Sequence, residues 1–384
     1  MAVFSNYYSL FLQKHLHQAH LYDRINANLP KEHPIMDQKT VLIGMSGGVD
    51  SSVAAWLLQE KGYRCIGGTM LLHDGAADTF DANQVAAKMS IPFHIFDHCA
   101  AFRQQVMEHF VQSYEAGLTP NPCTVCNKHL KFGTFLQQAL AMGCDFVATG
   151  HYARIEKDET TGRYLLKKAA DYSKDQTYFL YSLDQHQLSH TLFPLGALTK
   201  EQARTIAQEQ GFLNARKKDS QDICFIPDGD YPAFLRRFTG KDYPAGDFLD
   251  ENGRIVGRHS GAVDYTIGQR KGLGLAMGRP VYVCGKDMAA NTVTVSDNEA
   301  LFHTTLLADD WNFIAFDAPT APLRCTAKAR SRMAEQPCTL YPAENGSYRV
   351  VFDEAQRALT PGQAVVLYDG DTVLGGGIIR EVLK

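Results

Sequence analysis

Nine residues decide the fold of this chain: Gly44-Met45-Ser46-Gly47-Gly48-Val49-Asp50-Ser51-Ser52. They follow an apolar run at 40–45 that predicts a buried strand, and they precede a run at 51–62 that predicts a helix. Glycines let the backbone approach a ligand closely, and a helix N-terminus presents free N–H groups and the positive end of its dipole. The serine hydroxyls add donors for phosphate oxygens, and Asp50 could hold Mg²⁺ between phosphates. The stretch predicts a phosphate-binding loop, and the alternative is a turn whose serines only cap the helix.

The residues around this loop alternate short apolar runs with helical stretches. Strands are expected at 40–45, 64–70, 91–96 and 146–149, with helix-length segments between them. This alternation is typical of βαβ units, which form a parallel sheet covered on both faces. No Gly-x-x-x-x-Gly-Lys-Ser/Thr pattern occurs in the chain, which argues against the phosphate loop of kinases and related NTPases.

The C-terminal half has a different pattern, in which turn signals recur at short intervals. Asn252-Gly253, Asn345-Gly346 and Asp369-Gly370 are flanked by alternating apolar residues, which predicts antiparallel hairpins. We therefore expect the α/β class, with a parallel-sheet domain followed by one or two small β domains. Residues 1–38 are either a helical extension or the product of an upstream start site, since Met36 stands just before the first strand.

Composition limits the class of protein further. The 384 residues carry 38 Lys and Arg against 42 Asp and Glu, so any surface for nucleic acid is local rather than global. No stretch approaches the roughly 18 apolar residues of a membrane span, and the first 35 residues lack a secretory signal. Nine scattered cysteines in a large chain are typical of a reducing compartment. We expect a cytoplasmic protein with no membrane partner.

Three cysteines stand out by their surroundings. Cys123 and Cys126 lie in a proline-stiffened loop before a helical run at 128–142, and Cys224 follows the basic pair Lys217-Lys218. A thiol near a helix N-terminus has its thiolate favoured by the helix dipole, which makes it a nucleophile. The alternatives are half of a structural zinc site for the pair and a buried core position for Cys224. A structural role is expected for the remaining cysteines: Cys65, Cys99, Cys144, Cys284, Cys325 and Cys338.

Residues 46–51 (SGGVDS) resemble the PP-loop of ATP pyrophosphatases, which split ATP between its α and β phosphates. From residue 39 to the C-terminus the chain further resembles the bacterial tRNA-specific 2-thiouridylases. The segments that carry this resemblance are TPNP at 119–122, CNK at 126–128, ATGHY at 148–152, KDQTYFL at 174–180, KDS at 218–220, ICFI at 223–226, TIGQRKGLG at 266–274 and TPGQ at 360–363.

The resemblance implies a PP-loop domain over 39–225, a small β-rich domain over 226–300 and a β-barrel over 301–384. It also implies a role for particular residues. Those that would bind ATP are Gly44, Met45, Ser46, Gly47, Gly48, Val49, Asp50, Ser51, Met70 and Gly150. Asn121, Pro122 and Cys123 would hold the target base, Cys126 would be the catalytic nucleophile and Cys224 the persulfide carrier. Those that would contact tRNA are His151, Lys174, Asp175, Gln176, Arg330, Ser331 and Gln363, although Ser331 departs from the aromatic residue or histidine that is common there.

The reaction that the resemblance implies is replacement of O2 of a wobble uridine in tRNA by sulfur. ATP with Mg²⁺ would adenylate the oxygen, and a cysteine desulfurase or sulfur-relay protein would supply the sulfur to a monomeric enzyme. Many family members carry Asp where this chain has Cys123, so three cysteines could converge here. They would serve either as ligands of an iron–sulfur cluster or in a persulfide–disulfide cycle with Cys123 as a bystander, and both readings stay open.

Local basic groups would grip the RNA backbone. The candidates are Arg216-Lys217-Lys218, Arg236-Arg237, Arg270-Lys271 and Lys328 with Arg330 and Arg332. Two other functions compete with this reading. One is an amide-forming PP-loop ligase such as an NAD or GMP synthetase, and the other is a tRNA-binding protein whose nucleotide site is regulatory and inert.

Overall fold

The computed structural model describes residues 38–73, 79–217 and 223–383. Thr40–Lys384 forms one compact unit. Within the described residues, no helix has the length and apolar character that crossing a membrane requires.

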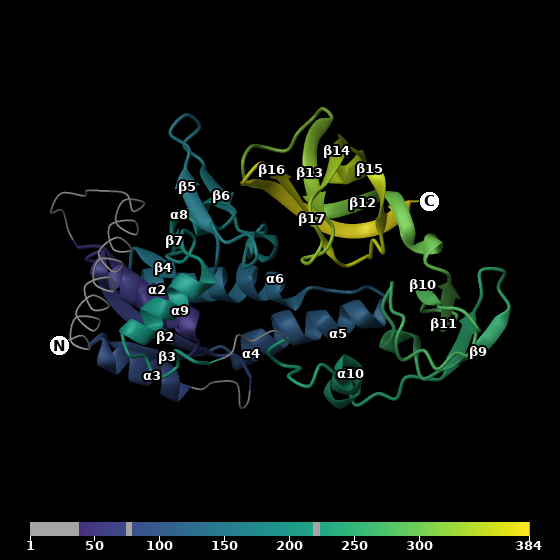
Figure 1. The fold of residues 1–384 in the computed structure, drawn as a ribbon, viewed down its shortest axis with the longest axis horizontal. Helices are drawn as coiled ribbons and strands as arrows, with labels where there is room; N and C mark the ends of the chain where they lie inside the picture. Colours follow the sequence, from purple (N-terminus) through teal and green to yellow (C-terminus); the bar gives the residue numbers. More distant parts are fainter. Residues whose placement is uncertain (1–37, 74–78, 218–222, 384) are drawn as a thin grey trace, which may run out of the picture. The chain divides into compact units, whose positions relative to one another are not determined.

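The first part of this unit is built on a parallel sheet with the strand order β3-β2-β1-β4-β7 (Figure 1). Its strands are β1 (Thr40–Gly44), β2 (Arg64–Leu71), β3 (Phe93–Asp97), β4 (Phe146–Ala148) and β7 (Thr191–Leu192). Val41, Leu42 and Ile43 of the central strand are fully buried. Continuous apolar strands of this kind are expected where helices cover both faces of a sheet, so the predicted βαβ pattern is confirmed.

Helices pack against this sheet and against one another. They are α2 (Val49–Glu60), α3 (Thr79–Lys88), α4 (Cys99–Phe102), α5 (Glu108–Glu115), α6 (Pro122–Cys126), α7 (Phe135–Ala141), α8 (Gln185–Ser189), α9 (Lys200–Glu209) and α10 (Tyr231–Thr239). Two π-helical segments interrupt the regular geometry, η1 (Arg103–Met107) and η2 (Asn127–Thr134). The helix expected at 128–142 is confirmed, but its first half is wound as a π-helix.

A small β domain follows, with the strand order β10-β11-β8-β9. Its strands are β8 (Gly246–Leu249), β9 (Ile255–His259), β10 (Tyr282–Asp287) and β11 (Thr292–Ser296). The turn predicted at Asn252-Gly253 joins β8 to β9, and Phe248, Val283 and Val293 form the fully buried centre of the domain.

The C-terminal part is a barrel, because strand β12 pairs with both β15 and β17 and so closes the sheet. Its strands are β12 (Phe302–Phe313), β13 (Leu323–Lys328), β14 (Gln336–Pro342), β15 (Tyr348–Arg357), β16 (Ala364–Asp369) and β17 (Thr372–Leu383). The hairpin of β5 (Arg154–Lys157) and β6 (Tyr164–Lys167) extends this sheet through the pairing of β6 with β17. The expected α/β class with a closing β-barrel is thereby confirmed.

Candidate active site

The phosphate loop, Gly44–Ser52, leaves the carboxyl end of the central strand β1 and enters α2. Gly47 has a φ of +70°, a conformation that glycine adopts at no steric cost. The hydroxyls of Ser51 and Ser52 donate to the carbonyl of Gly48 at 3.1 and 3.0 Å. The N-cap residue is Gly48, and among the described residues no side chain caps the helix. The serines therefore shape the loop rather than cap α2, which leaves this helix end suited to a phosphate.

Two neighbours hold the loop in place. The amide of buried Asn214 donates to the carbonyl of Gly47 at 3.1 Å and to the hydroxyl of Ser52 at 2.9 Å. Gly150 packs directly on the loop, since a Cβ at this position would lie 2.7 Å from backbone atoms of Asp50 and Ser51. Gly150, expected to bind ATP, thus lies against the loop that would bind the phosphates. Met70 lies near the carboxyl end of β2, beside the strand from which the loop starts.

Asp50 is the charged group of the loop, and both of its carboxylate oxygens are engaged. The Nζ of Lys200 lies 2.8 Å from each oxygen, and the hydroxyl of Tyr152 donates to Oδ1 at 2.9 Å. Lys200 comes from the first turn of α9, and its side chain is 11% exposed. A Mg²⁺ ion held by Asp50 would therefore have to compete with an ammonium already in place. Nothing in the sequence around Lys200 indicates a role at the loop, because only the packing of α9 on α2 brings its side chain there.

The candidate nucleophiles stand on the cysteine helix, which we define as α6 together with η2 (residues 122–134). The side chain of Asn121 caps it by accepting from the N–H of Cys123 at 3.2 Å, and Pro122 occupies the first turn. Cys123 is exposed, whereas Cys126 is 7% exposed. The three residues expected at the target base therefore begin one helix with the expected nucleophile.

Cys224 approaches the same place from a distant part of the chain. Phe225 and Ile226 are buried in the apolar cluster that contains Cys126, while Cys224 itself is exposed. The alternative that Cys224 is a buried core residue is wrong, because its neighbours take the core positions. Segment 218–222, with Lys218 and the KDS pattern, lies outside the described residues.

The three thiols are close enough to influence one another's ionisation. The pKa of the Cys126 thiol is raised to about 12, mainly by burial, with a smaller contribution from the negative charge of the neighbouring Cys224 and Cys123 thiolates. Cys123 and Cys224 are exposed residues, but the protein around their sulfur atoms displaces water and likewise raises the pKa values of both thiols. The expectation that the helix dipole would favour a thiolate is wrong for this conformation, because loss of hydration outweighs the dipole.

Lys131 is the cation that opposes this effect, and sequence reasoning missed it. Its positive charge lowers the pKa values of Cys123, Cys126 and Cys224 alike. In an α-helix, a residue five positions after Cys126 would point about 140° away from it. In the π-helical turn that begins after Cys126, residues five apart are hydrogen-bonded neighbours instead. The π-helix therefore accounts for the position of Lys131 beside the thiols.

The thiols do not make a metal site in this arrangement. Over the described ranges, no group of three His, Cys, Asp or Glu side chains is placed to hold a metal ion. In this conformation Cys123, Cys126 and Cys224 are thus not gathered as a three-ligand set for a metal ion. All nine cysteines, each within the described ranges, are free thiols. Cys325 and Cys338, given only structural roles, face each other in the barrel core with 3.6 Å between their sulfur atoms.

His151 links the loop to the thiols. It follows Gly150, its Nδ1 lies 2.7 Å from the hydroxyl of Thr149, and its ring packs between Phe132 and Phe193. Burial and the charge of Lys131 hold its pKa well below the usual value, so the ring is neutral. Lys131 therefore acts on both the thiols and the residue next to Gly150.

The other residues expected at tRNA mostly make internal contacts. Asp175 accepts from Thr177, and burial raises its pKa. Gln176 accepts from the N–H of Tyr152 at 2.9 Å, while Lys174 is half-buried. These bonds order the segment beside Tyr152, the residue that also donates to Asp50.

Two further residues expected at tRNA connect parts of the fold. Arg330 is half-buried and donates to the carbonyl of Ile267 and to the hydroxyl of Thr360. The side chain of Gln363 donates to the carbonyl of Thr119 at 2.8 Å, and Ser331 is half-buried.

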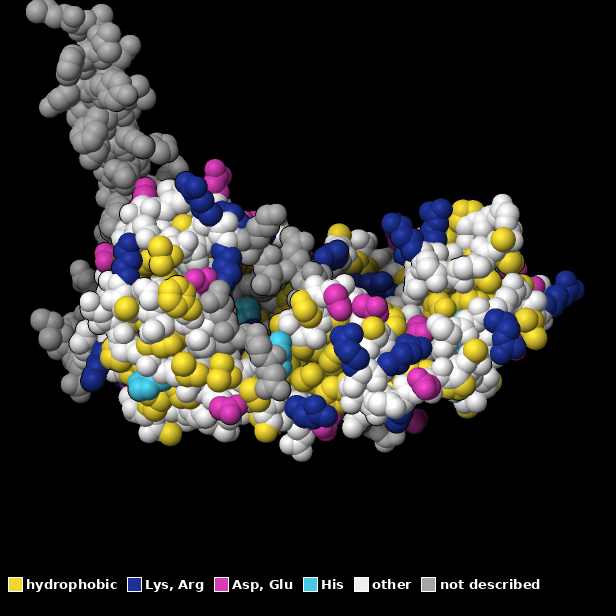
Figure 2. All heavy atoms as spheres, turned by 90° about the horizontal axis from the view of Figure 1, so that it is seen from below, with side chains coloured by type: hydrophobic (Ala, Val, Ile, Leu, Met, Phe, Trp, Pro, Cys, Tyr) yellow, Lys and Arg dark blue, Asp and Glu magenta, His cyan; other side chains and the backbone are white. Residues whose placement is uncertain are grey.

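The predicted basic clusters differ in how available they are. Arg236 is paired with Asp264, and Lys217 with Asp81. Arg237, Arg270, Lys271 and Arg332 are exposed. On the face shown in Figure 2, Lys and Arg side chains are dispersed among Asp and Glu rather than gathered into one patch.

A phosphate loop at the carboxyl end of a parallel sheet, with β domains behind it, defines a PP-loop protein of the α/β class. Family models match three successive regions: the tRNA methyl transferase HUP domain at residues 39–228, the tRNA methyl transferase PRC-barrel domain at 232–297 and the aminomethyltransferase beta-barrel domain at 303–379. The tRNA-specific 2-thiouridylase MnmA of Clostridioides difficile is 49% identical over 90% of this chain and 99% of its own length. The protein of the same name from Acetivibrio thermocellus is 47% identical over 90% of this chain and 100% of its length. The chain belongs to the tRNA-specific 2-thiouridylase family.

Proposed function

We propose that the protein is an ATP-dependent tRNA-uridine 2-sulfurtransferase, which replaces O2 of the wobble uridine by sulfur. The observation that carries this proposal is that Cys126 shares a helix with Cys123 and an apolar cluster with Phe225 and Ile226, the two residues after Cys224, while Gly150 packs on the phosphate loop. A nucleotide site and a group of thiols in one place suit a reaction that needs both. The names of its relatives support tRNA as the substrate.

The first step is activation of the uracil oxygen, because oxygen is a poor leaving group. Uracil O2 attacks the α-phosphate of ATP, pyrophosphate leaves, and the base carries AMP on O2. The free amides at the start of α2 would hold the departing pyrophosphate. Mg²⁺ bound with ATP would neutralise phosphate charge, and Asp50, which Lys200 and Tyr152 hold in place, is the loop carboxylate that would contact it.

The second step delivers sulfur. A sulfur donor first loads the Cys224 thiol as a persulfide, and the exposure of Cys224 supports this role. The terminal sulfur attacks C2 and displaces AMP, which leaves the base joined to Cys224 through a disulfide. The thiolate of Cys126 then attacks Sγ of Cys224, so that 2-thiouridine is released and a Cys126–Cys224 disulfide remains. A reductant restores both thiols before the next turnover.

The environment of Cys126 keeps its thiol from reacting with the persulfide too early. A thiol with a pKa of about 12 stays protonated and does not reduce the persulfide before the base has reacted. Lys131 is the group that can favour its thiolate once the base has arrived. Extrusion of the base from its loop costs a few kcal/mol, and contacts of the β domains with the RNA backbone would offset that cost.

The test is thiolation of unmodified tRNA with ATP, Mg²⁺ and a persulfide donor, followed by nuclease digestion and mass spectrometry of nucleosides. Wild-type protein is expected to form 2-thiouridine, and Cys224→Ser is expected to bind tRNA and ATP but transfer no sulfur. Cys144→Ala is the matched control, since Cys144 is buried just before β4, at the end of the sheet opposite the loop. Repeated turnover by Cys224→Ser would remove the persulfide role. Thiouridine formed from free sulfide in step with bound iron would favour the cluster instead.

A further inference from the structure

The C-terminal barrel makes a direct connection to the cysteine helix through one short turn. We define the clamp turn as Thr360–Gln363, between β15 and β16. The carbonyl of Pro361 accepts from the N–H of Thr119 at 2.9 Å, and the side-chain amide of Gln363 donates to the carbonyl of Thr119 at 2.8 Å. Both backbone polar groups of Thr119 are thus satisfied by this one turn.

The clamp turn and the chain at Thr119 are closely packed as well as hydrogen-bonded. Gly362 has a φ of +89°, and a Cβ there would lie 2.8 Å from the nitrogen of Thr119 and 2.9 Å from Cβ of Leu118. Backbone therefore packs on backbone, and a side chain at position 362 would force the two segments apart.

The clamp turn is itself held rigidly in the barrel. The N–H of Gly362 donates to the carbonyl of Ile379 at 2.8 Å, and the N–H of Ile379 donates to the carbonyl of Gln363 at 2.8 Å. Arg330 bridges the hydroxyl of Thr360 to the carbonyl of Ile267 in the small β domain. A bonded path therefore runs from that domain through the barrel to Thr119.

Thr119 lies two residues before the cap of the cysteine helix. The intervening chain is Thr119-Pro120-Asn121-Pro122, in which both prolines restrict the backbone. A shift of Thr119 would be passed to Asn121 and from there to Cys123, whose N–H the Asn121 side chain accepts.

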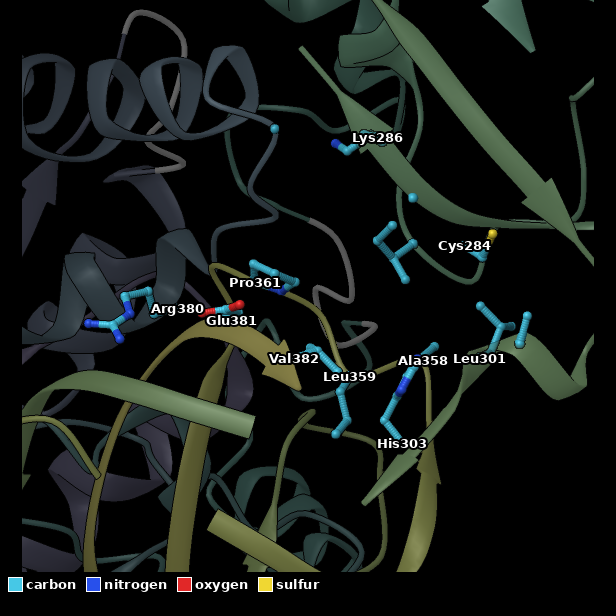
Figure 3. Close-up of a pocket in the computed structure, with 14 residues that line it drawn as sticks. Cys284, Lys286, Leu301, His303, Ala358, Leu359, Pro361, Arg380, Glu381 and Val382 are labelled. Carbon is cyan, nitrogen blue, oxygen red and sulfur yellow. The ribbon is translucent and has the colours of Figure 1, made fainter. Parts of the chain in front are cut away.

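A cavity of about 300 Å³ lies beside the clamp turn. Figure 3 shows Pro361, Glu381 and Val382 on one side of it and Cys284 and Lys286 on the other. Gly117, which precedes the clamped segment, also lines the cavity. The chain just before Thr119 therefore borders open space on one side, although Gly117 itself packs closely on Met288.

We propose that Gln363 is a positioning residue, whose bond to Thr119 holds the cysteine helix in register and couples the barrel to the thiols. The inference rests on the proposed function for its catalytic consequence only. In this conformation the Gln363 side-chain amide donates to the carbonyl of Thr119 rather than facing solvent. Removing the amide should therefore disturb the cysteine helix even when no RNA is bound.

The experiment compares wild type, Gln363→Met and Gly362→Ala as full-length, RNA-free proteins by hydrogen exchange and by iodoacetamide labelling of Cys126. Both variants should exchange about tenfold faster across residues 117–127 and label Cys126 several-fold faster. The second variant keeps the amide but introduces the clashing Cβ. Gln336→Met, on strand β14 of the same barrel, is the matched control and should behave as wild type.

Turnover then separates positioning from RNA contact. Gln363→Met should lower kcat for thiolation about tenfold while KM for tRNA changes less than twofold. Unchanged exchange and labelling together with weaker tRNA binding would overturn the proposal and make Gln363 an RNA contact. Absence of thiolation by wild type would refute the proposed function, while the exchange and labelling results would still decide the clamp.

Discussion

Replacement of Lys200 by methionine is the perturbation that most directly tests how the phosphate loop is held. Methionine keeps most of the apolar length of lysine but removes the ammonium that lies 2.8 Å from both oxygens of Asp50. Asp50 would retain the hydroxyl of Tyr152 as a donor. The carboxylate would lose its cationic partner while remaining 30% exposed.

The magnitude follows from distance and burial. At 2.8 Å and an effective dielectric constant of about 20, the Coulomb attraction is about 6 kcal/mol, most of which repays desolvation. Breaking a fully buried pair costs about 3–5 kcal/mol. The partial exposure of Asp50 and the remaining bond to Tyr152 reduce this to about 2–3 kcal/mol. If the loop needs this pair to hold its shape, catalytic efficiency with ATP falls roughly 30- to 150-fold, at about 1.4 kcal/mol per factor of ten.

The assay is tRNA-dependent release of AMP at varied ATP concentration. Lys200→Met should show the stated loss in kcat/KM for ATP while its affinity for tRNA is retained. Lys241→Met is the matched control, since Lys241 pairs with Glu115 at 2.7 Å but is 59% exposed and lies outside the site. The control should change less than about twofold, as exposed pairs contribute little. An equal effect in both variants, or none in Lys200→Met, would refute the role given to Asp50 and Lys200.

Two further predictions concern lysines with unusual surroundings. Nζ of Lys286 is buried without a hydrogen-bond partner among the described residues, and burial lowers its pKa to about 8. In the unfolded chain Lys286 keeps the usual pKa near 10.5. The free-energy penalty of burying the charged ammonium is therefore complete below pH 8, and it disappears as the pH rises toward 10.5. Lys286→Met should raise the free energy of unfolding by about 2–3 kcal/mol at pH 7, and the gain measured by urea titration should shrink between pH 8 and 10; a gain independent of pH would contradict this. Lys131→Met should raise the pKa of Cys224 and slow its alkylation by iodoacetamide several-fold at pH 8, whereas Lys131→Arg should not; equal rates in all three proteins would show that Lys131 does not act on the thiols.

The sequence was sufficient to predict the fold where local patterns decide it. The strands, the phosphate loop and the hairpins at Asn345-Gly346 and Asp369-Gly370 follow from apolar periodicity and from the backbone freedom of glycine, both of which act over a few residues. A C-terminal barrel was expected, but the strands that close it, β12 and β17, could not be predicted, because their pairing joins distant segments.

Some residues of the candidate site could likewise be predicted from local motifs, whereas others depend on contacts that the sequence does not reveal. Cys126 and Asp50 stand in recognisable local motifs, so their importance could be predicted. Lys131 could not be found, because its place beside the thiols depends on a π-helical turn rather than on the regular helix that the pattern indicates. Lys200 and Gln363 act through contacts with residues 150 and 244 positions away, and nothing in their own neighbourhoods signals this.

The ionisation of the thiols was predicted with the wrong sign for a physical reason. A sequence shows the helix N-terminus that would favour a thiolate, but it does not show how deeply the sulfur will be buried. Burial outweighs the opposing charge of Lys131, and the pKa of Cys126 is raised to about 12.

The central claim is that adenylation at the loop and sulfur transfer at Cys224 belong to one reaction on tRNA. It is tested most directly by a single turnover without oxygen, in which protein carrying a persulfide on Cys224 is mixed with ATP, Mg²⁺ and unmodified tRNA. AMP and 2-thiouridine are then measured in the same samples. We predict that one AMP is released for each 2-thiouridine formed, with a Cys126–Cys224 disulfide appearing in equal amount. Release of AMP without thiouridine, in the presence of the loaded persulfide, would contradict the account.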